Sequence, residues 1–129
     1  MQKAITKGTY NISTPINAVT ATTTSEEIII AGAKKVSLMF TRANHSAGSS
    51  TFTVEVSLNG TTYVAYNKLI SNVTNTNAQT LTRVASVALS SDTSALYSMD
   101  LQHDSIYSMK ITVTEATDGT HTAQCLIER

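Results

Sequence analysis

The fold of this chain is decided by the stretch Thr51-Phe52-Thr53-Val54-Glu55-Val56-Ser57-Leu58. Apolar side chains occupy every second position, at Phe52, Val54, Val56 and Leu58, and polar side chains lie between them. Successive side chains of a β-strand point to opposite faces, so this spacing predicts a strand with one buried face. We therefore expect Phe52, Val54 and Val56 in a core, joined by Ile111 and Val113 from a second alternating stretch.

The strand is followed by Asn59-Gly60, a pair that favours a tight β-hairpin turn. Two registers fit this turn. A two-residue loop pairs Leu58 with Thr61 and turns Tyr63 and Ala65 inward. A three-residue loop, with Gly60 in the left-handed conformation, pairs Ser57 with Thr61 and turns Thr62, Val64 and Tyr66 inward. Val64 and Tyr66 make the better core pair, so we expect the three-residue loop, with Tyr63 on the outer face.

Other parts of the chain carry further strand signals. Alternation is plain at 36–41 and 107–114, weaker at 121–127, and shorter apolar runs lie at 28–30 and 95–101. The long stretch 79–89 changes the parity of its apolar positions between Leu81 and Val84, which indicates a bulge or twist. Asp118-Gly119 is placed to join the last two strands in a hairpin. The pattern predicts an all-β fold, a single antiparallel β-sandwich of jelly-roll type with about seven or eight strands, formed as one domain by residues 1–129.

Residues 1–19 have two interpretations. Ile12 and Ile16 are at helical spacing, but Pro15 lies between them and disfavours helical geometry at Thr14, so the segment is expected to be extended. It is then either an edge strand of its own sandwich or an arm that packs on a neighbouring subunit or a particle.

Charge in this chain is sparse, balanced and dispersed. Nine Lys and Arg residues face nine Asp and Glu residues, and the polar character comes instead from 22 Thr, 15 Ser and 8 Asn. No basic cluster exceeds the pair Lys34-Lys35. Nucleic acids and anionic membranes bind concentrated positive charge, so we expect neither as a partner. The first residues lack the apolar stretch of a secretion signal, and no apolar run is long enough to span a membrane, so we expect synthesis in the cytoplasm.

The sequence offers weak candidates for chemistry. Asp100-Leu101-Gln102-His103-Asp104 brings carboxylates and an imidazole together, as a metal site would, but Asp at a strand connection is more often a turn former. His45, His103 and His121 are interpreted as surface loop residues, although a triad assembled from distant strands stays open because triads are recognised by geometry. The carboxylates Glu26, Glu27 and Glu55 have no distinguishing context. We therefore predict no catalytic, metal or cofactor-binding residues, and no enzymatic activity.

Two more residue types limit the function. Cys125 is the only cysteine, lies in an apolar run and is predicted to be a buried, inert thiol. Sugar-binding platforms use coplanar aromatic faces, but the chain has no Trp. Tyr63 and Tyr66 are three positions apart, so a regular strand points them to opposite faces.

The segment Phe52–Tyr66, with Ser98-Met99-Asp100-Leu101, 107–113 and Thr117-Asp118-Gly119-Thr120, resembles small β-sandwich virion proteins of tailed bacteriophages. The resemblance implies a particle component, either a capsid decoration (cement) protein or a tail accessory protein. It also implies a homo-oligomer, a trimer, that contacts the major capsid protein or another virion protein. It carries no catalytic residue and leaves the binding residues unknown. The alternative is a carbohydrate- or receptor-binding module; a small hydrolase on a sandwich scaffold is a third hypothesis.

Overall fold

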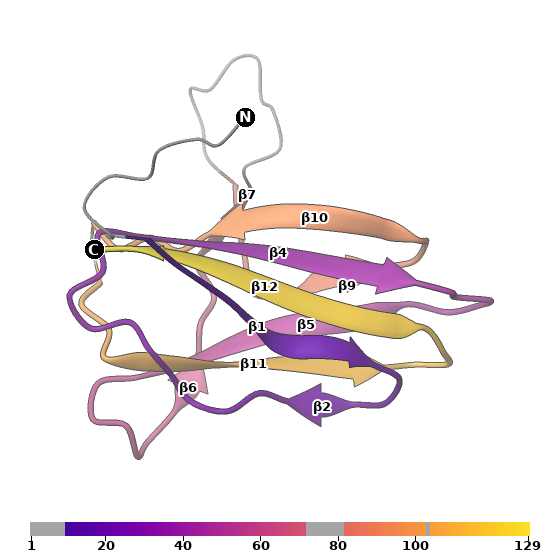
Figure 1. The fold of residues 1–129 in the computed structure, drawn as a ribbon, viewed down its shortest axis with the longest axis horizontal. Coiled ribbons are helices and arrows are strands. Elements are labelled where there is room, and N and C mark those ends of the chain that lie inside the picture. Colours follow the sequence, from indigo (N-terminus) through magenta and orange to yellow (C-terminus); the bar gives the residue numbers. More distant parts are fainter. Residues whose placement is uncertain (1–9, 72–81, 103) are drawn as a thin grey trace.

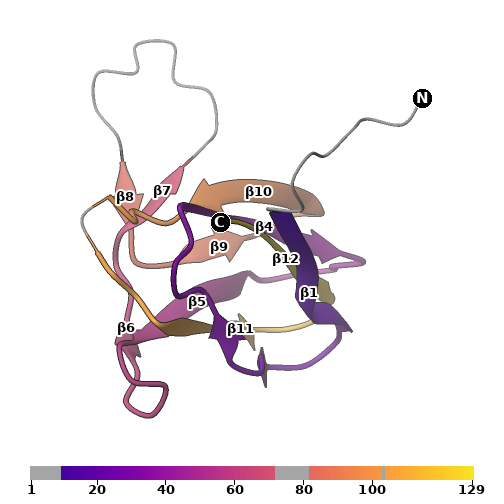
Figure 2. The same ribbon diagram turned by 60° about the vertical axis from the view of Figure 1, so that its left-hand side comes forward.

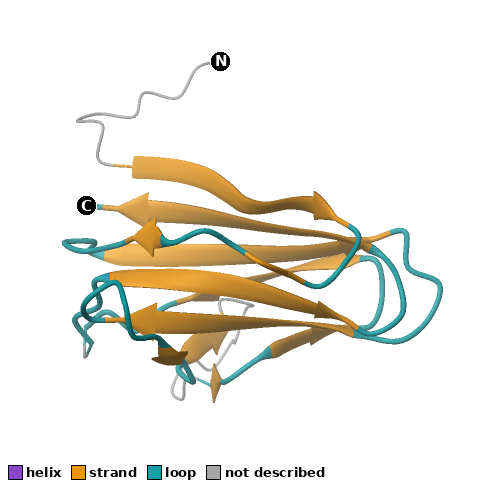
Figure 3. Cartoon of the chain, turned by 90° about the horizontal axis from the view of Figure 1, so that it is seen from below, coloured by secondary structure: helices purple, strands orange, loops and turns teal. Residues whose placement is uncertain are grey.

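In the computed structural model, which describes residues 10–71, 82–102 and 104–129, the chain forms two antiparallel sheets packed face to face (Figures 1 and 3). The described residues contain no helix, and none of them forms a helical segment suited to crossing a membrane. The first sheet has the strand order β1 (Tyr10–Val19), β12 (Thr120–Glu128), β4 (Lys35–Ala43), β10 (Thr93–Ser98), β7 (Leu69–Ser71) and β8 (Arg83–Val84). The second has β2 (Thr23–Thr24), β11 (Ser108–Glu115), β5 (Ser50–Ser57) and β6 (Val64–Ala65), with β3 (Ile28–Ile29) on β11 and β9 (Val87–Leu89) on β5.

The prediction of an all-β antiparallel sandwich is confirmed, but the number of strands is higher than predicted. Twelve strands are present in the described residues, and several are only two or three residues long. These short strands, such as β2, β3 and β6, lie within stretches that connect the long strands. Their two-residue lengths are too short to show a period of two in the sequence.

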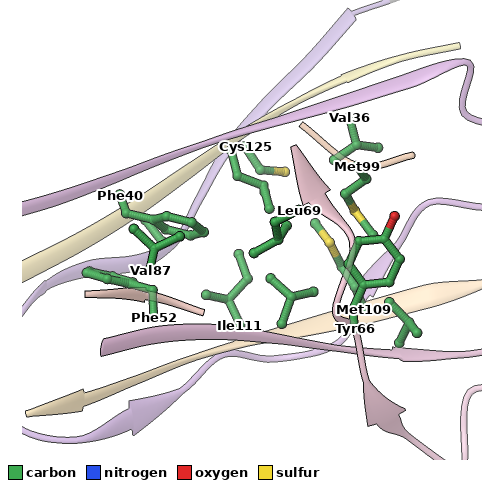
Figure 4. Close-up of a cluster of buried hydrophobic side chains, with 14 of the residues drawn as sticks. Val36, Phe40, Phe52, Tyr66, Leu69, Val87, Met99, Met109, Ile111 and Cys125 are labelled. Atoms are coloured by element: carbon green, nitrogen blue, oxygen red, sulfur yellow. The ribbon is translucent and has the colours of Figure 1, made fainter. Parts of the chain in front are cut away.

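The core lies between the two sheets and contains the side chains that alternation predicted (Figure 4). Phe52, Val54, Val56, Ile111 and Val113 are all buried. At the centre, the rings of Phe40 and Phe52 stack with their centroids 4.7 Å apart, one from each sheet. Burial of large side chains of this kind is the main stabilising contribution to the fold.

Leu58 was expected on the same buried face, and this expectation is wrong. The strand β5 ends at Ser57, and the Leu58 side chain is 77% exposed. Ser57 Oγ accepts hydrogen bonds from the backbone N–H groups of Asn59 and Gly60, which ends the strand and begins the turn. Alternation continues into Leu58 in the sequence, but the backbone has already left the sheet.

The hairpin after β5 has a longer loop than either of the two predicted. Val56 pairs with Val64 and Glu55 with Ala65, so neither Leu58 nor Ser57 pairs with Thr61. Gly60 does adopt the left-handed conformation, with φ of 78°, and Tyr66 is buried as predicted. Val64 is 61% exposed, however, because the two-residue β6 lies at the edge of its sheet.

Two connections cross between the sheets where the sequence suggested continuity. The stretch 79–89 was expected as one bulged strand, yet β8 belongs to the first sheet and β9 to the second. The change of parity after Leu81 precedes this crossing; Leu81 itself lies outside the described residues. Asp118-Gly119 was expected to close a hairpin, but β11 and β12 lie in different sheets, so the turn bridges the two layers.

Residues 10–19 form β1, the edge strand that pairs with β12. The register shifts between Ser13 and Ile16, an interval that contains Pro15. It shifts again between Ile16 and Val19, an interval that contains Ala18, whose φ is 54°. Such irregularities discourage edge-to-edge pairing along this strand. Ile16 is buried in the core, so residues 10–19 belong to their own sandwich rather than to an arm. Residues 1–9 lie outside the described residues.

Cys125 should react very slowly with thiol reagents in the folded protein. The thiol is buried, and its sulfur lies 3.5 Å from Ser13 Oγ. Burial raises the pKa of Cys125, which lowers the thiolate fraction that reacts. We expect labelling by 5,5′-dithiobis(2-nitrobenzoate) at neutral pH to be complete only after denaturation. Full labelling of the native protein within the mixing time would contradict the buried position of β12.

Candidate functional surface

The two ends of the sandwich differ in chemistry. We call one the polar end: it is formed by the connections at 20–22, 44–49, 90–92 and 116–119. We call the other the apolar end: it includes the start of β1, the end of β12, the β5–β6 hairpin and the segments 29–34, 99–102 and 104–107. Figure 1 shows the apolar end on the left, where the C-terminus and β6 lie.

Arg42 organises the polar end. In the sequence, Arg42 is one of several dispersed charged residues. In the structure, its side chain is buried and only 1% exposed. Its guanidinium donates to four carbonyl oxygens, which come from two connections and from the end of β9: Gly48 at 2.7 Å, Ala47 at 2.9 Å, Asp118 at 2.7 Å and Leu89 at 2.9 Å. Gly119 lies against it: a Cβ at that position would come within 2.9 Å of Arg42 Nε. The polar end is thus held together by one buried cation.

A histidine–serine pair lies beside this cation. His121 Nε2 is 2.7 Å from Ser50 Oγ, and His121 Nδ1 is 3.2 Å from the carbonyl oxygen of Val19. The spacing is that of a base next to a nucleophile. Both side chains are fully buried, however, so neither is open to a substrate in this structure. The interpretation of His121 as a surface residue is wrong: it continues the buried row of β12, with Ala123 as the next member.

The exposed groups of the polar end form local hydrogen bonds. His45 Nδ1 lies 2.6 Å from Asp92 Oδ1, and hydrogen bonds from the His45 backbone and side chain lower the pKa of Asp92. Ser46 donates from both its backbone and its hydroxyl to Asp118, which lowers the pKa of that carboxyl. These contacts close the loop after β4 rather than build a concave site.

The structure separates the residues considered for a metal site. Asp100 is buried and accepts from Arg83, with Nη2 to Oδ2 at 3.1 Å, while Asp104 pairs with Lys68 at 3.1 Å. His103 lies outside the described residues. Within the described ranges, no three His, Cys, Asp or Glu side chains are grouped as metal ligands would be. The two carboxylates instead face cations of their own chain.

The remaining carboxylates and tyrosines take part in packing around the hairpin. The hydroxyl of Tyr63 donates to Glu27 at 2.8 Å and lies 3.0 Å from Ser108 Oγ, while Lys110 Nζ lies 4.6 Å from the Tyr63 ring centroid. Hydrogen bonds from Ser108 and Tyr63 lower the pKa of Glu27. Tyr66 is in the core, so Tyr63 and Tyr66 do not form a sugar-binding platform. Glu26 is exposed, and Glu55 is half-buried opposite Lys110.

Tyr97 and Tyr107 differ in their surroundings. Tyr97 packs partly buried against the core, with its ring centroid 6.2 Å from that of Phe40. Tyr107 comes just before β11, is 41% exposed and lies at the apolar end.

The apolar end gathers exposed hydrophobic side chains. The described residues include eight large hydrophobic side chains that are strongly exposed, and seven of them lie at this end: Tyr10, Ile12, Ile29, Leu58, Val64, Tyr107 and Leu126. Leu96, in the middle of β10, is the eighth. Scattered exposed hydrophobic residues are ordinary, whereas a gathering at one place marks an interaction surface.

Two adjoining depressions are cut into the apolar end. The hairpin groove, about 600 Å³ in volume, lies between the β5–β6 hairpin and residues 104–106. The turn groove, about 540 Å³, lies between residues 30–33 and residues 104–107. Both have Leu58, Asp104, Ser105 and Ile106 in their walls, so they meet at these residues. Volumes of this size are typical of binding sites.

The sequence analysis did not predict this surface, although one feature of the sequence indicated part of it. Two of its members, Leu58 and Val64, were assigned to the core because they continue an alternating pattern. Ile29 stands in an apolar run of three, Ile28-Ile29-Ile30, in which a strand must turn one side chain outward. That run could have identified one exposed residue, but the grouping at one end needs the three-dimensional structure.

The fold and this surface together describe an all-β antiparallel sandwich with one apolar end. No protein-family model matches the chain, and no curated protein matches its sequence. The chain is similar in structure to the SPBc2 prophage-derived protein YomS, with a TM-score of 0.65 and 16% sequence identity. The match covers 99% of this chain and 100% of that one. At this identity the likeness establishes the fold.

Proposed function

We propose that the protein is a structural component of a bacteriophage particle, a capsid decoration protein that acts through protein–protein contacts at its apolar end. In this proposal it is a homo-oligomer, a trimer, that binds the major capsid protein or another virion protein. It works without catalysis, cofactor, nucleic acid or membrane. It is made in the host cytoplasm and functions in the virion.

The observation that carries this proposal is the gathering of seven exposed hydrophobic side chains and two grooves at one end of the sandwich. An end of this kind suits a protein that stands on a surface, since the long axis of the sheets then points outward. The prophage origin of YomS, whose fold spans the whole of both chains, supports a phage role. The low charge of the chain, 14%, also suits a protein whose surface is covered by neighbours.

The test is whether the protein is part of the particle. We expect mass spectrometry of purified particles, from the host that produces them, to find the chain as an abundant component. In an add-back experiment, purified protein should sediment with particles that lack it. Leu58→Lys with Val64→Lys should abolish sedimentation, whereas Leu96→Lys, an equally large change away from the apolar end, should not. Expression of the chain without any copies in purified particles would refute the proposal.

A further inference from the structure

We infer that the grooves at the apolar end receive the N-terminal segment, residues 1–9, of a second copy of this chain. The inference rests on the proposed function and names the partner of the same surface. Its basis is the shape and chemistry of the grooves, the position at which β1 begins, and the composition of the segment that precedes β1.

The hairpin groove is built to take an extended apolar chain. Its floor contains Val56, Tyr66 and Ile106, all buried, and the exposed side chains of Leu58 and Val64 stand at its rim. The strand β6 borders it, and within the described residues β6 pairs only with β5, leaving its outer side open. An extended segment that pairs with an open strand edge gains backbone hydrogen bonds, while pockets below receive alternate side chains.

The strand that follows residues 1–9 in the sequence begins at the end that carries these grooves. The strand β1 begins at Tyr10, which pairs with Glu128 at the end of β12. Arg129 links this corner to the turn groove, since its guanidinium donates to Asn11 Oδ1 and to the carbonyl oxygens of Ile29 and Ala31. Nine residues in extended conformation span at most about 30 Å. The segment is therefore long enough to fill both grooves of an adjacent molecule.

The composition of the segment matches the grooves. Met1-Gln2-Lys3-Ala4-Ile5-Thr6-Lys7-Gly8-Thr9 contains three apolar side chains, no proline and no acidic residue. Its two lysines would meet Asp104 in the groove wall and Glu27, whose carboxylate lies beside the turn at Gly60. Lys68 already contacts Asp104, so the electrostatic contribution is small and apolar contact with the floor carries the binding.

The position of β1 favours a second copy over the segment's own hairpin groove. β1 and β6 lie at opposite edges of the two sheets, at diagonal corners of the apolar end (Figure 2). Three strand spacings and one inter-sheet spacing separate such corners by about 17 Å, so roughly five extended residues would be used in crossing. β1 also runs away from the apolar end, so the chain before Tyr10 would have to reverse. A neighbouring copy receives all nine residues without this reversal.

Exchange of this kind is head-to-tail: each copy gives a segment at one corner and receives one at the other. A head-to-tail contact closes into a ring when its rotation allows, and a trimer is such a ring. The grooves would then be filled in the assembled ring, and the rest of the apolar end would remain for the particle.

A complementation experiment tests the inference. One chain lacks residues 2–9 and keeps its grooves; the other carries Leu58→Lys and Val64→Lys and keeps its N-terminal segment. Both altered side chains are exposed, so circular dichroism should show both proteins folded. We expect light scattering to find oligomers for the full chain and for the control Leu96→Lys, and monomers for each altered chain. An equimolar mixture of the two altered chains should form a mixed complex.

A peptide of residues 1–9 provides a second measurement. Labelled at its C-terminus, it should bind the chain lacking residues 2–9 in a fluorescence anisotropy titration. The two groove substitutions, introduced into that same shortened chain, should weaken binding at least about tenfold.

Three results would overturn the inference: oligomers that persist without residues 2–9, a mixture that stays monomeric while the full chain assembles, or a full chain that is monomeric at every concentration. Incorporation into particles is measured separately. Abundance in particles with a failed complementation would remove only the inference, whereas absence from particles would remove the proposed function.

Discussion

Val54→Asp should unfold the protein. Val54 is 1% exposed and lies in the core on β5, paired with Ile111 of β11. A carboxylate at this position would have no cation within the apolar core to pair with, and burying it costs several kcal/mol. Small proteins are stable by only about 5–15 kcal/mol in total, so most of the stability would be lost. Far-UV circular dichroism with thermal unfolding should show either no cooperative transition or insoluble protein.

Thr51→Asp is the matched control. Thr51 is on the same strand with the opposite parity, half-buried on the outer face of the second sheet. There the new carboxylate stays in contact with water, and we expect a change of about 1 kcal/mol or less, from the lower strand preference of Asp. A soluble Val54→Asp protein that melts at the unchanged temperature would contradict the assignment of faces on β5.

The interior of the long strands could be predicted from sequence because its signal is local. In β5 and β11, the buried apolar residues lie two positions apart, and the predicted core members of both strands are buried. The prediction failed where strands end. Leu58 continues the alternation of β5 but lies in the turn, because the hydrogen bonds of Ser57 end the strand one residue earlier. Nothing in the period-two pattern marks that event.

Which sheet a strand joins is not a local property, and the sequence could not show it. Asp118-Gly119 has the residues of a hairpin turn, yet β11 and β12 are in different sheets. The strand β12 pairs with β4 over nine residue pairs and also with β1, so its place is decided by partners far away in the chain. The same holds for the apolar end, whose members come from five separate segments.

The burial of Arg42 was missed, and His121 was interpreted as a loop residue, although the alternating pattern included both. Val36, Leu38 and Phe40 face inward, and the same parity places Arg42 inward as well. The row of Ala123 and Cys125 likewise includes His121. A charged residue on a buried face is normally taken as the end of the strand, because burying a charge is costly unless hydrogen bonds compensate for it. For Arg42, carbonyl oxygens of two loops accept the compensating hydrogen bonds, and the sequence does not show that these loops lie beside Arg42.

Arg42→Met should destabilise the protein strongly although methionine fills a similar volume. Four carbonyl oxygens, from two connections and the end of β9, lose their donor, and the hydrogen bond to Leu89 is buried. Each buried acceptor left without a partner costs about 1–3 kcal/mol, so we expect a loss of about 3–5 kcal/mol in the free energy of unfolding. Arg42→Lys should lose most of the same amount, because one ammonium group cannot reach four acceptors with the geometry of a guanidinium. Urea titration followed by circular dichroism measures both.

Arg129→Met tests whether the destabilisation expected for Arg42→Met comes from the loss of buried hydrogen bonds or from the loss of hydrogen bonds in general. Arg129 also donates to carbonyl oxygens, those of Ile29 and Ala31, but these contacts are exposed to solvent. Water replaces the donor when an exposed arginine is removed, so we expect a change below about 1 kcal/mol. If Arg42→Met were no more destabilising than Arg129→Met, the buried guanidinium would not be what holds the loops of the polar end. Since Arg42 and the apolar end lie at opposite ends of the sheets, Arg42→Lys in the chain lacking residues 2–9 should weaken folding without changing the affinity of the folded fraction for the peptide of residues 1–9.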